Sequence, residues 1–371
     1  MKIPLIVAAA LICLSALCCT DKAIADEVND IMTDAGDTML RILPSLYSDD
    51  PDRTLVMENL IRLDYLFNQA EPHFVEEQEG AQVTFELLRE RLRDAIQLGE
   101  RHNINLMRSA VDDAFGLCAS CHTQDRRIKR AFGVSKIRAL DEYLAGEFSY
   151  LTRDYESALT SFTNYLESDK RTLVRDANAF DRALVITAEV LADPALARDI
   201  LKSMLKHVDE GNVIHRHTTD WISALDRLAT EPDALTSPLG KKSVDALDGF
   251  LDHEWPTIQA TLTWAAQEAY WVVIRSELNG FLSRGASGSD VPRLLYWLGV
   301  SDRALQYRFY GSLSKGYLEK CIEAHPTDPY AKRCLEEYEM LILVSFSGSG
   351  GTNVPLEVRS RLAELRAMVY R

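Results

Sequence analysis

Several patterns that mark common enzyme classes are missing from this sequence of 371 residues. It has no serine, histidine and aspartate in the order of a hydrolase triad, no paired-carboxylate motif and no HExxH zinc motif. The Gly-rich stretch over residues 345–352 lacks the lysine of a phosphate-binding loop, and no strand pattern precedes it. These absences leave a bound cofactor as the expected source of any chemistry, and they leave enzymatic activity an open question.

Long apolar runs are also scarce. Residues 3–19 form an uncharged apolar run, and no later stretch has the roughly 18 uninterrupted apolar residues that a membrane-spanning helix needs. A positive charge precedes the run and an A-x-A cleavage site follows it at residues 23–25, so we predict a signal peptide over residues 1–25 and a mature start at Asp26. Cys18 and Cys19 leave a lipoprotein signal as the less favoured alternative. The sequence therefore predicts a periplasmic or secreted protein without a transmembrane segment after signal removal.

Positive charge is in short supply. The chain has 41 Lys and Arg against 56 Asp and Glu, which gives a formal net charge of −15 at pH 7. This excess argues against nucleic acid or an anionic membrane surface as a partner, because both repel an acidic protein. It suits solubility, or a protein partner that carries a basic patch.

Cysteine is limited to seven residues, of which three fall in the predicted signal peptide. Two others belong to Cys118-Ala119-Ser120-Cys121-His122, which is the C-x-x-C-H attachment motif of a c-type haem. Two thiols one helical turn apart can add to the two vinyl groups of one porphyrin, while the imidazole that follows becomes the proximal iron ligand. A redox or zinc-binding CxxC is the alternative, but the chain has no second CxxC and no βαβ pattern here. We therefore predict one covalently bound haem c.

The last two cysteines, Cys321 and Cys334, lie on two predicted helices joined by a turn over residues 325–329. In an oxidising compartment such a pair is expected to form a disulfide, and a helical hairpin could bring the sulfur atoms within bonding distance. Two buried free thiols are the alternative.

Hydrophobic periodicity predicts four helices in residues 26–131. Apolar residues recur every three or four positions over about 27–47, then from residue 51 to a break at Glu71-Pro72, and again over 80–99, where Gly99 marks the end. The fourth helix begins near Asn103 or Asn105. One face of it carries Met107, Ala110, Val111, Ala114, Cys118 and Cys121. The haem motif therefore lies late in the last helix of a four-helix unit.

The end of this helix, Phe115-x-x-Cys118-x-x-Cys121-His122-x-x-x-Arg126, resembles the cytochrome c-prime family and its low-spin relatives. The resemblance covers residues 26–131. It implies an up-and-down four-helix bundle that holds haem c between its helices. Arg126 stands where the family often has a basic residue.

The start of the first helix, residues 27–32, is similar to the low-spin members of that family, in which a methionine near this point is the sixth iron ligand. The resemblance assigns that role to Met32. Met39 follows seven residues later on the same helical face, so at most one of the two is expected to reach the iron. A core position for the methionine, a second histidine ligand from His73 or His102, or an open sixth position are the alternatives.

The sequence pattern of residues 132–371 predicts further helices, and it has a weak resemblance to tetratricopeptide repeats (TPR). In residues 145–166 a helix is followed by a tight turn near Arg153-Asp154 and by a second helix, in which small Ala158 allows close approach while Tyr155 and Phe162 fill the gap. A second partial match spans residues 294–335, and a helical bundle without repeats is the alternative. The expected fold class is all-α, with a four-helix haem bundle followed by a TPR-like solenoid domain.

Together these features predict a periplasmic monohaem cytochrome that passes single electrons through a haem ligated by His122 and Met32. A redox protein is the expected partner, and the TPR-like part would dock a peptide or protein. A five-coordinate haem protein that binds or senses a diatomic gas, or reduces peroxide, is one alternative. A TPR-type interaction scaffold with an accessory haem is the other, and it rests on fold analogy.

Overall fold

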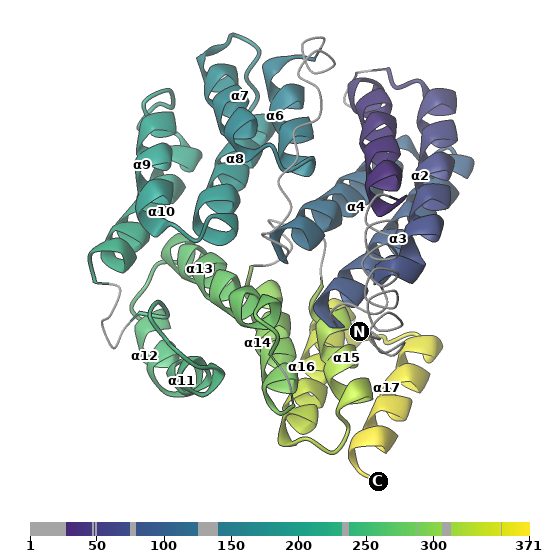
Figure 1. Cartoon of the computed structure of the whole chain (residues 1–371), viewed down its shortest axis with the longest axis vertical. Coiled ribbons are helices and arrows are strands. Elements are labelled where there is room, and N and C mark those ends of the chain that lie inside the picture. The colour runs from purple at the N-terminus through teal and green to yellow at the C-terminus, as the bar shows by residue number, and fades with distance from the viewer. Residues whose placement is uncertain are drawn as a thin grey trace, which may run out of the picture. The chain divides into compact units, whose positions relative to one another are not determined.

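The computed structural model describes residues 27–46, 48, 50–74, 79–124, 140–231, 237–286, 288–305, 313–349 and 351–371 (Figure 1). The predicted signal peptide and Arg126 lie outside these residues. Within them the fold is all-helical, as the sequence predicts, apart from a small antiparallel hairpin of β1 (Ser347–Gly348) and β2 (Gly351–Thr352). This hairpin lies in the Gly-rich stretch, which connects the last two helices rather than forming a phosphate-binding loop.

The chain forms two compact units. Residues up to Glu77 and Leu92–Ala110 make the first unit, and Gln78–Arg91 with Val111–Arg371 make the second. The helices α3 (Glu79–Glu100) and α4 (Ile104–Gln124) therefore contribute residues to both units. The sequence-based division at residue 131 stays a prediction.

The four helices predicted before residue 131 are present: a first helix over residues 27–46, then α2 (Arg53–Phe74), α3 and α4. α2 does not end before Pro72, contrary to the prediction, but continues two residues beyond it. A proline so close to a helix end removes few backbone hydrogen bonds, so the helix tolerates it. α3 ends at Glu100, within one residue of the end predicted at Gly99, and His102 follows with a φ of 58°.

In the first unit, apolar burial and surface ion pairs hold the helices together. Along the apolar stripe of the first helix, Ala35, Met39, Ile42, Leu43 and Leu46 are each no more than 5% exposed, whereas Val28 and Met32 are half-buried. Arg62 of α2 pairs with Asp34 of the first helix at 3.0 Å. Arg93 of α3 lies 3.7 Å from Asp64 of α2. Neighbouring helices of the unit are thus joined in sequence order.

From residue 140 onward the described part of the second unit is a succession of helices. In order these are α6 (Glu142–Leu151), α7 (Tyr155–Glu167), α8 (Leu173–Leu184), the π-helix η1 (Val185–Val190), α9 (Pro194–Leu205), α10 (Val213–Thr230), α11 (Val244–Gly249), the π-helix η2 (Phe250–Glu254), α12 (Trp255–Gln259), α13 (Trp264–Ser283), α14 (Asp290–Ala304), α15 (Ser314–Ala324), α16 (Pro329–Ser345) and α17 (Leu356–Val369). Most helices pack against their neighbours in sequence, such as α6 on α7, α9 on α10 and α14 on α15. α14 also packs on α16, the next helix but one.

Side-chain caps begin several of these helices, among them α9 and α10. Asp193 accepts a hydrogen bond from the backbone N–H of Leu196 at 2.9 Å where α9 starts. Asn212 accepts one from the N–H of Ile214 at 2.9 Å where α10 starts. Each cap satisfies a backbone donor that the first helical turn leaves without a partner.

The sequence from Pro256 through Trp264, Tyr270 and Trp271 predicts a single helix, and this prediction is wrong. Pro256 does stand at a helix start, but α12 ends at Gln259. A new helix, α13, then begins after Thr263, whose hydroxyl accepts from the N–H of Ala266 at 3.2 Å. Threonine is a strong N-cap residue, and here the cap separates the two helices.

Two helix pairs of the second unit have the same close contact. A Cβ atom on Gly146 of α6 would lie 2.6 Å from the ring of Phe162 in α7, and one on Gly299 of α14 would lie 2.8 Å from Leu318 in α15. A larger residue at either place would force the facing side chain or the helix to move, so glycine allows the close approach. Ala158 of α7 is fully buried, as the sequence predicts.

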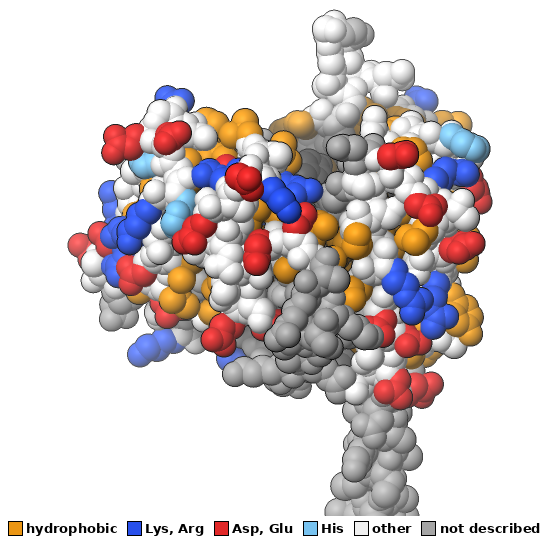
Figure 2. Space-filling view, turned by 90° about the horizontal axis from the view of Figure 1, so that it is seen from above, with side chains coloured by type: hydrophobic (Ala, Val, Ile, Leu, Met, Phe, Trp, Pro, Cys, Tyr) orange, Lys and Arg blue, Asp and Glu red, His pale blue; other side chains and the backbone are white. Residues whose placement is uncertain are grey.

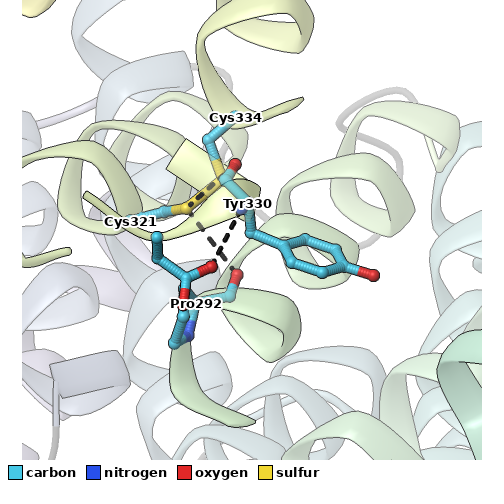
Figure 3. Close-up of a disulfide and its surroundings, with 5 residues drawn as sticks. Pro292, Cys321, Tyr330 and Cys334 are labelled. Atoms are coloured by element: carbon cyan, nitrogen blue, oxygen red, sulfur yellow. Dashed lines mark hydrogen bonds between the residues drawn. A yellow bond between two sulfur atoms is a disulfide. The ribbon is translucent and has the colours of Figure 1, made fainter. Parts of the chain in front are cut away.

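A disulfide joins α15 to α16, as predicted (Figure 3). The Cα atoms of Cys321 and Cys334 are 6.5 Å apart, and both residues are fully buried. The sulfur of Cys321 lies 3.6 Å from the carbonyl oxygen of Pro292 in α14 and 3.8 Å from that of Tyr330 in α16. The bridge therefore fixes the first turns of α16 inside the core.

Replacing both Cys321 and Cys334 by alanine is expected to lower the free energy of unfolding of the second unit by roughly 3 kcal/mol. The bridge closes a short loop, and its loss gives entropy back to the unfolded chain. Urea unfolding followed by circular dichroism measures the change, with dithiothreitol-treated wild type as the matched comparison. Equal urea midpoints for the wild type and the double variant would contradict the prediction.

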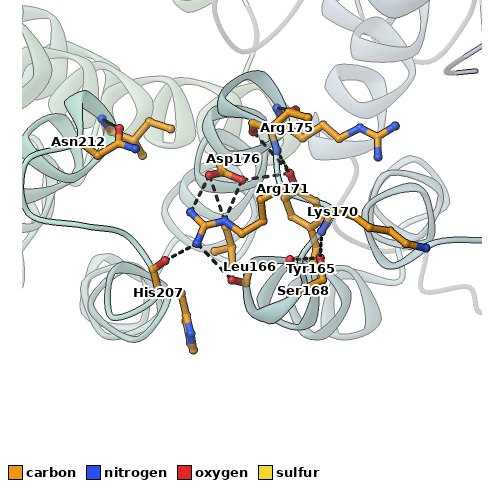
Figure 4. A network of polar contacts seen from close by, with 11 residues as sticks. Tyr165, Leu166, Ser168, Lys170, Arg171, Arg175, Asp176, His207 and Asn212 are labelled. Atoms are coloured by element: carbon orange, nitrogen blue, oxygen red, sulfur yellow. Dashed lines mark hydrogen bonds and ion pairs between the residues drawn. The ribbon is translucent and has the colours of Figure 1, made fainter. Parts of the chain in front are cut away.

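A polar network fixes the connection between α7 and α8 (Figure 4). Asp176 accepts from the guanidinium of Arg171 at 2.6 Å and from the hydroxyl of Tyr165 at 3.0 Å. Arg171 also donates to the carbonyl oxygen of His207, just beyond α9. Burial raises the pKa of Tyr165, so its hydroxyl remains a donor at neutral pH. The network links the ends of three helices.

Candidate functional site

The haem-attachment motif lies in one uninterrupted helix. Asn103 caps α4, as predicted, by accepting from the N–H of Leu106 at 3.2 Å. α4 then continues to Gln124, and it contains both Cys118 and Cys121. Two residues three positions apart in an α-helix are neighbours on the same surface, one turn apart. The backbone therefore places the two cysteines with the spacing that attachment to a single porphyrin needs.

A row of buried apolar residues leads up to the motif. The predicted inward residues Met107, Ala110, Val111 and Ala114 are each no more than 7% exposed. Phe115 and Leu117, which the sequence analysis did not assign to this row, are also buried, at 4% and 1% exposure. Thiols and an imidazole at the end of an apolar helix are the donor set and setting that a covalently held porphyrin requires. The residues present therefore fit haem c.

The surroundings of α4 disfavour charge. Asp113, five residues before Cys118, is half-buried, and burial raises the pKa of its carboxyl above the usual range. Arg91 of α3 opposes this rise but does not cancel it. The raised pKa of this carboxyl indicates that Asp113 itself is weakly solvated.

Met32 and Met39 lie on the first helix with different burial. Met32 is half-buried, whereas Met39 is 5% exposed within the apolar core. A cavity of about 650 Å³ opens beside the start of this helix, and Met32 is not among its lining residues, which are Glu27, Asp30, Ile31, Thr33, Asp34, Leu66 and Gln69. Met32 belongs to the first unit and the C-x-x-C-H motif to the second. Its role as iron ligand stays a prediction.

Among the histidines proposed as alternative ligands, His102 is exposed in the turn between α3 and α4, and its ring Nδ1 lies 3.0 Å from the carbonyl oxygen of Glu100. His73 lies in the last turn of α2. Within the described ranges, no three or more His, Cys, Asp or Glu residues gather to form a metal-binding cluster.

Two buried charged groups of the second unit were not predicted from the sequence. Glu268 in α13 accepts from His217 at 2.5 Å, from Trp221 at 3.1 Å and from Trp264 at 3.0 Å. His217 is half-buried because α13 packs on α10. The second group pairs Glu189 of η1 with an arginine of α13. A charged residue within the apolar sequence of α13 was the signal that could have indicated both.

Acidic and basic side chains are interspersed on the face shown in Figure 2, so the excess of negative charge does not gather there in one patch. Over the part of the chain that the structure describes, none of the helices has the length and apolar character needed to cross a membrane.

Comparisons with protein-family models, with curated proteins and with solved structures give no match to this chain. The functional argument therefore depends on the residues of the chain itself.

Proposed function

We propose that the protein is a periplasmic monohaem c-type cytochrome that transfers one electron at a time. The observation that carries this proposal is the C-x-x-C-H sequence over residues 118–122, placed within α4. The buried apolar row before the motif supports it. The apolar run and A-x-A site at the start of the sequence support export to the compartment where such haem is attached.

Each candidate residue has a distinct role in this proposal. Cys118 and Cys121 hold the porphyrin through thioether bonds, and His122 gives the proximal nitrogen ligand. Met32 gives the sixth ligand through its thioether sulfur, and Arg126 supplies a positive charge near the motif. When bound, the haem supplies one-electron exchange at its iron, and methionine ligation raises its reduction potential. The helices of residues 26–131 would form the four-helix bundle around it.

We further propose that residues 132–371 form a TPR-like domain that docks a protein partner. The repeated close contact supports it, since Gly146 against Phe162 and Gly299 against Leu318 pair two successive helices in the same way. The tight turn between α6 and α7 also supports it, with Arg153 at a φ of 66°. Repeats of this kind stack helix pairs into an extended surface.

The test of the haem proposal is the purified holoprotein from a host that matures c-type cytochromes. We expect an added mass of one haem and a pyridine haemochrome spectrum of the c type. The C118A/C121A variant is expected to be colourless and of unmodified mass, whereas C321A/C334A keeps the haem and serves as the matched control. Colourless wild-type protein without added mass would refute the proposal. A broad high-spin Soret band would favour the five-coordinate alternative.

A further inference from the structure

Three aspartates of one short helical segment face other helices of the second unit. The acidic segment, residues 244–254, consists of α11 and η2 and carries Asp245, Asp248 and Asp252. Positions i, i+3 and i+7 fall on one side of a helix, so the three carboxylates form a row. Each carboxylate of the row has a partner on α14 or α16.

Helix α14 contacts the first two aspartates. Arg293 forms an ion pair with Asp245. The indole nitrogen of Trp297 donates to Asp248 at 2.7 Å, and the same oxygen accepts from the hydroxyl of Tyr330 of α16 at 2.5 Å. Burial, together with the bond to Asp248, raises the pKa of Tyr330, so the hydroxyl stays a donor.

Helix α16 contacts the third aspartate through a bidentate pair. The two terminal nitrogens of Arg333 donate to the two oxygens of Asp252 at 2.9 and 2.6 Å. The guanidinium carbon of Arg333 lies 4.4 Å from the ring centroid of Tyr296, 4.8 Å from that of Tyr330 and 5.4 Å from that of Trp297. Aromatic rings around the guanidinium hold its planar fork in the orientation that a carboxylate requires.

These five residues form a recognition face: Arg293, Tyr296 and Trp297 of α14 with Tyr330 and Arg333 of α16. The disulfide supports it, because Cys334 follows Arg333 directly and anchors the first turns of α16. The face presents two arginines on a chain of net charge −15. It is therefore suited to read carboxylates at fixed spacing.

The polar contacts of the acidic segment can be replaced by contacts with water or with another ligand. Asp245 is 78% exposed, and Asp252 and Arg333 are 30% and 32% exposed, so water can replace these bonds. The apolar residues Val244, Leu247 and Leu251 are buried and hold the segment to the fold separately from the aspartates. Half of the segment is a π-helix, a less stable backbone form that frequently accompanies functional sites.

We propose that the recognition face binds a helical segment of a partner protein with carboxylates at positions i, i+3 and i+7, and that residues 244–254 occupy the face as an internal competitor. Grooves that bind helices generally read such spacings. A tethered segment has an effective concentration in the millimolar range, so only a partner that satisfies all three contacts displaces it. The inference deepens the docking role proposed above and does not depend on the haem.

The test uses the full-length holoprotein with the internal competitor weakened. In the D245N/D252N variant two of the three aspartates lose their charge, so the segment competes less strongly for the face. The probe is a fluorescein-labelled synthetic peptide of residues 241–257, measured by fluorescence anisotropy. We expect the peptide to bind the variant at least tenfold more tightly than the wild type. A peptide with asparagine in place of all three aspartates is expected to bind at least tenfold more weakly than the natural one.

A substitution of Arg333 on the recognition face gives the matched control. Adding R333K to the double variant keeps the charge but removes the bidentate fork, so binding of the natural peptide should fall at least tenfold. Equal binding of the natural and asparagine peptides, or no binding by a variant whose circular dichroism matches the wild type, would overturn the inference. An unchanged haem spectrum in every variant separates such a failure from a failure of the haem proposal.

Amide hydrogen exchange gives a second readout that needs no peptide. In the single variant D245N, which removes an exposed ion pair, we expect exchange that is about threefold faster and confined to residues 244–254. Unchanged exchange, or a loss of protection that spreads through α14 and α16, would show that the segment is an integral part of the core and would reject the proposal.

Discussion

Replacing Arg275 by methionine is expected to destabilise the second unit by roughly 3–5 kcal/mol. Arg275 of α13 donates to both carboxylate oxygens of Glu189 in η1, at 2.9 and 2.6 Å, and the two side chains are only 6% and 2% exposed. Without the guanidinium, Glu189 would keep a buried charge that has lost its bidentate partner. Urea unfolding followed by far-ultraviolet circular dichroism measures the loss.

The destabilisation is expected to extend beyond this pair. Arg275 also lies 4.0 Å from Asp302 of α14, and Asp302 accepts from the backbone N–H groups of Leu313 and Ser314 at 2.8 Å each. Buried charges thus link η1 and α13 to α14 and to the start of α15. Hydrogen exchange in the variant should therefore accelerate in α15 as well as in η1.

Two variants control for this interpretation. The double variant E189L/R275M is expected to recover most of the lost stability, because it removes both charges from the core. R366M breaks an exposed pair, in which Arg366 lies 2.7 Å from Glu339, and is expected to cost less than about 1 kcal/mol. If R275M unfolds at the same urea concentration as R366M, the buried pair does not stabilise the unit.

In the holoprotein, replacing Met32 by alanine is expected to convert the low-spin spectrum to a high-spin one. The same variant should lower the reduction potential by on the order of 100 mV, within the ~0.8 V range that axial ligands cover. The reason is the loss of the proposed thioether ligand, which favours the reduced iron. Absorption spectra of both oxidation states and potentiometric titration measure the two changes.

Met39 is the matched control for this prediction. It lies on the same helix but is 5% exposed, so M39A is expected to reduce stability by roughly 2–5 kcal/mol while the absorption spectrum stays unchanged. A low-spin spectrum that survives in M32A would show that Met32 is not the ligand. The variants H73A and H102A would then test the two histidines.

What the sequence determined is chiefly local. The all-helical class follows from the 3.6-residue period of the apolar residues, and the breaks before α9 and α10 follow from the capping residues Asp193 and Asn212. The disulfide was predictable for two reasons. Cys321 and Cys334 lie on two predicted helices joined by one turn, and all other cysteines belong to the motif or to the predicted signal peptide. The C-x-x-C-H motif could be recognised because its chemistry depends on five consecutive residues.

A local signal misled the prediction at one helix end: Pro72 resembles a stop, yet α2 runs through it. Gly99 marks the end of α3 to within one residue, but its role is not that of a left-handed cap. Arg53 donates to the carbonyl oxygen of Gly99 at 2.8 Å, and a Cβ on Gly99 would lie 2.1 Å from the sulfur of Met57. This glycine is therefore used for close packing with α2, and the turn falls at His102 instead.

Only the tertiary structure decided which charged residues meet. Glu189 and Arg275 are 86 residues apart in the chain, and the aspartates of the acidic segment lie about as far from their arginine and tyrosine partners on α16. The periodicity of the apolar residues predicts which side of a helix faces inward, but not which other helix that side will contact. That choice depends on the packing of whole helices against one another, because burying a charge is tolerable only where packing delivers its partner.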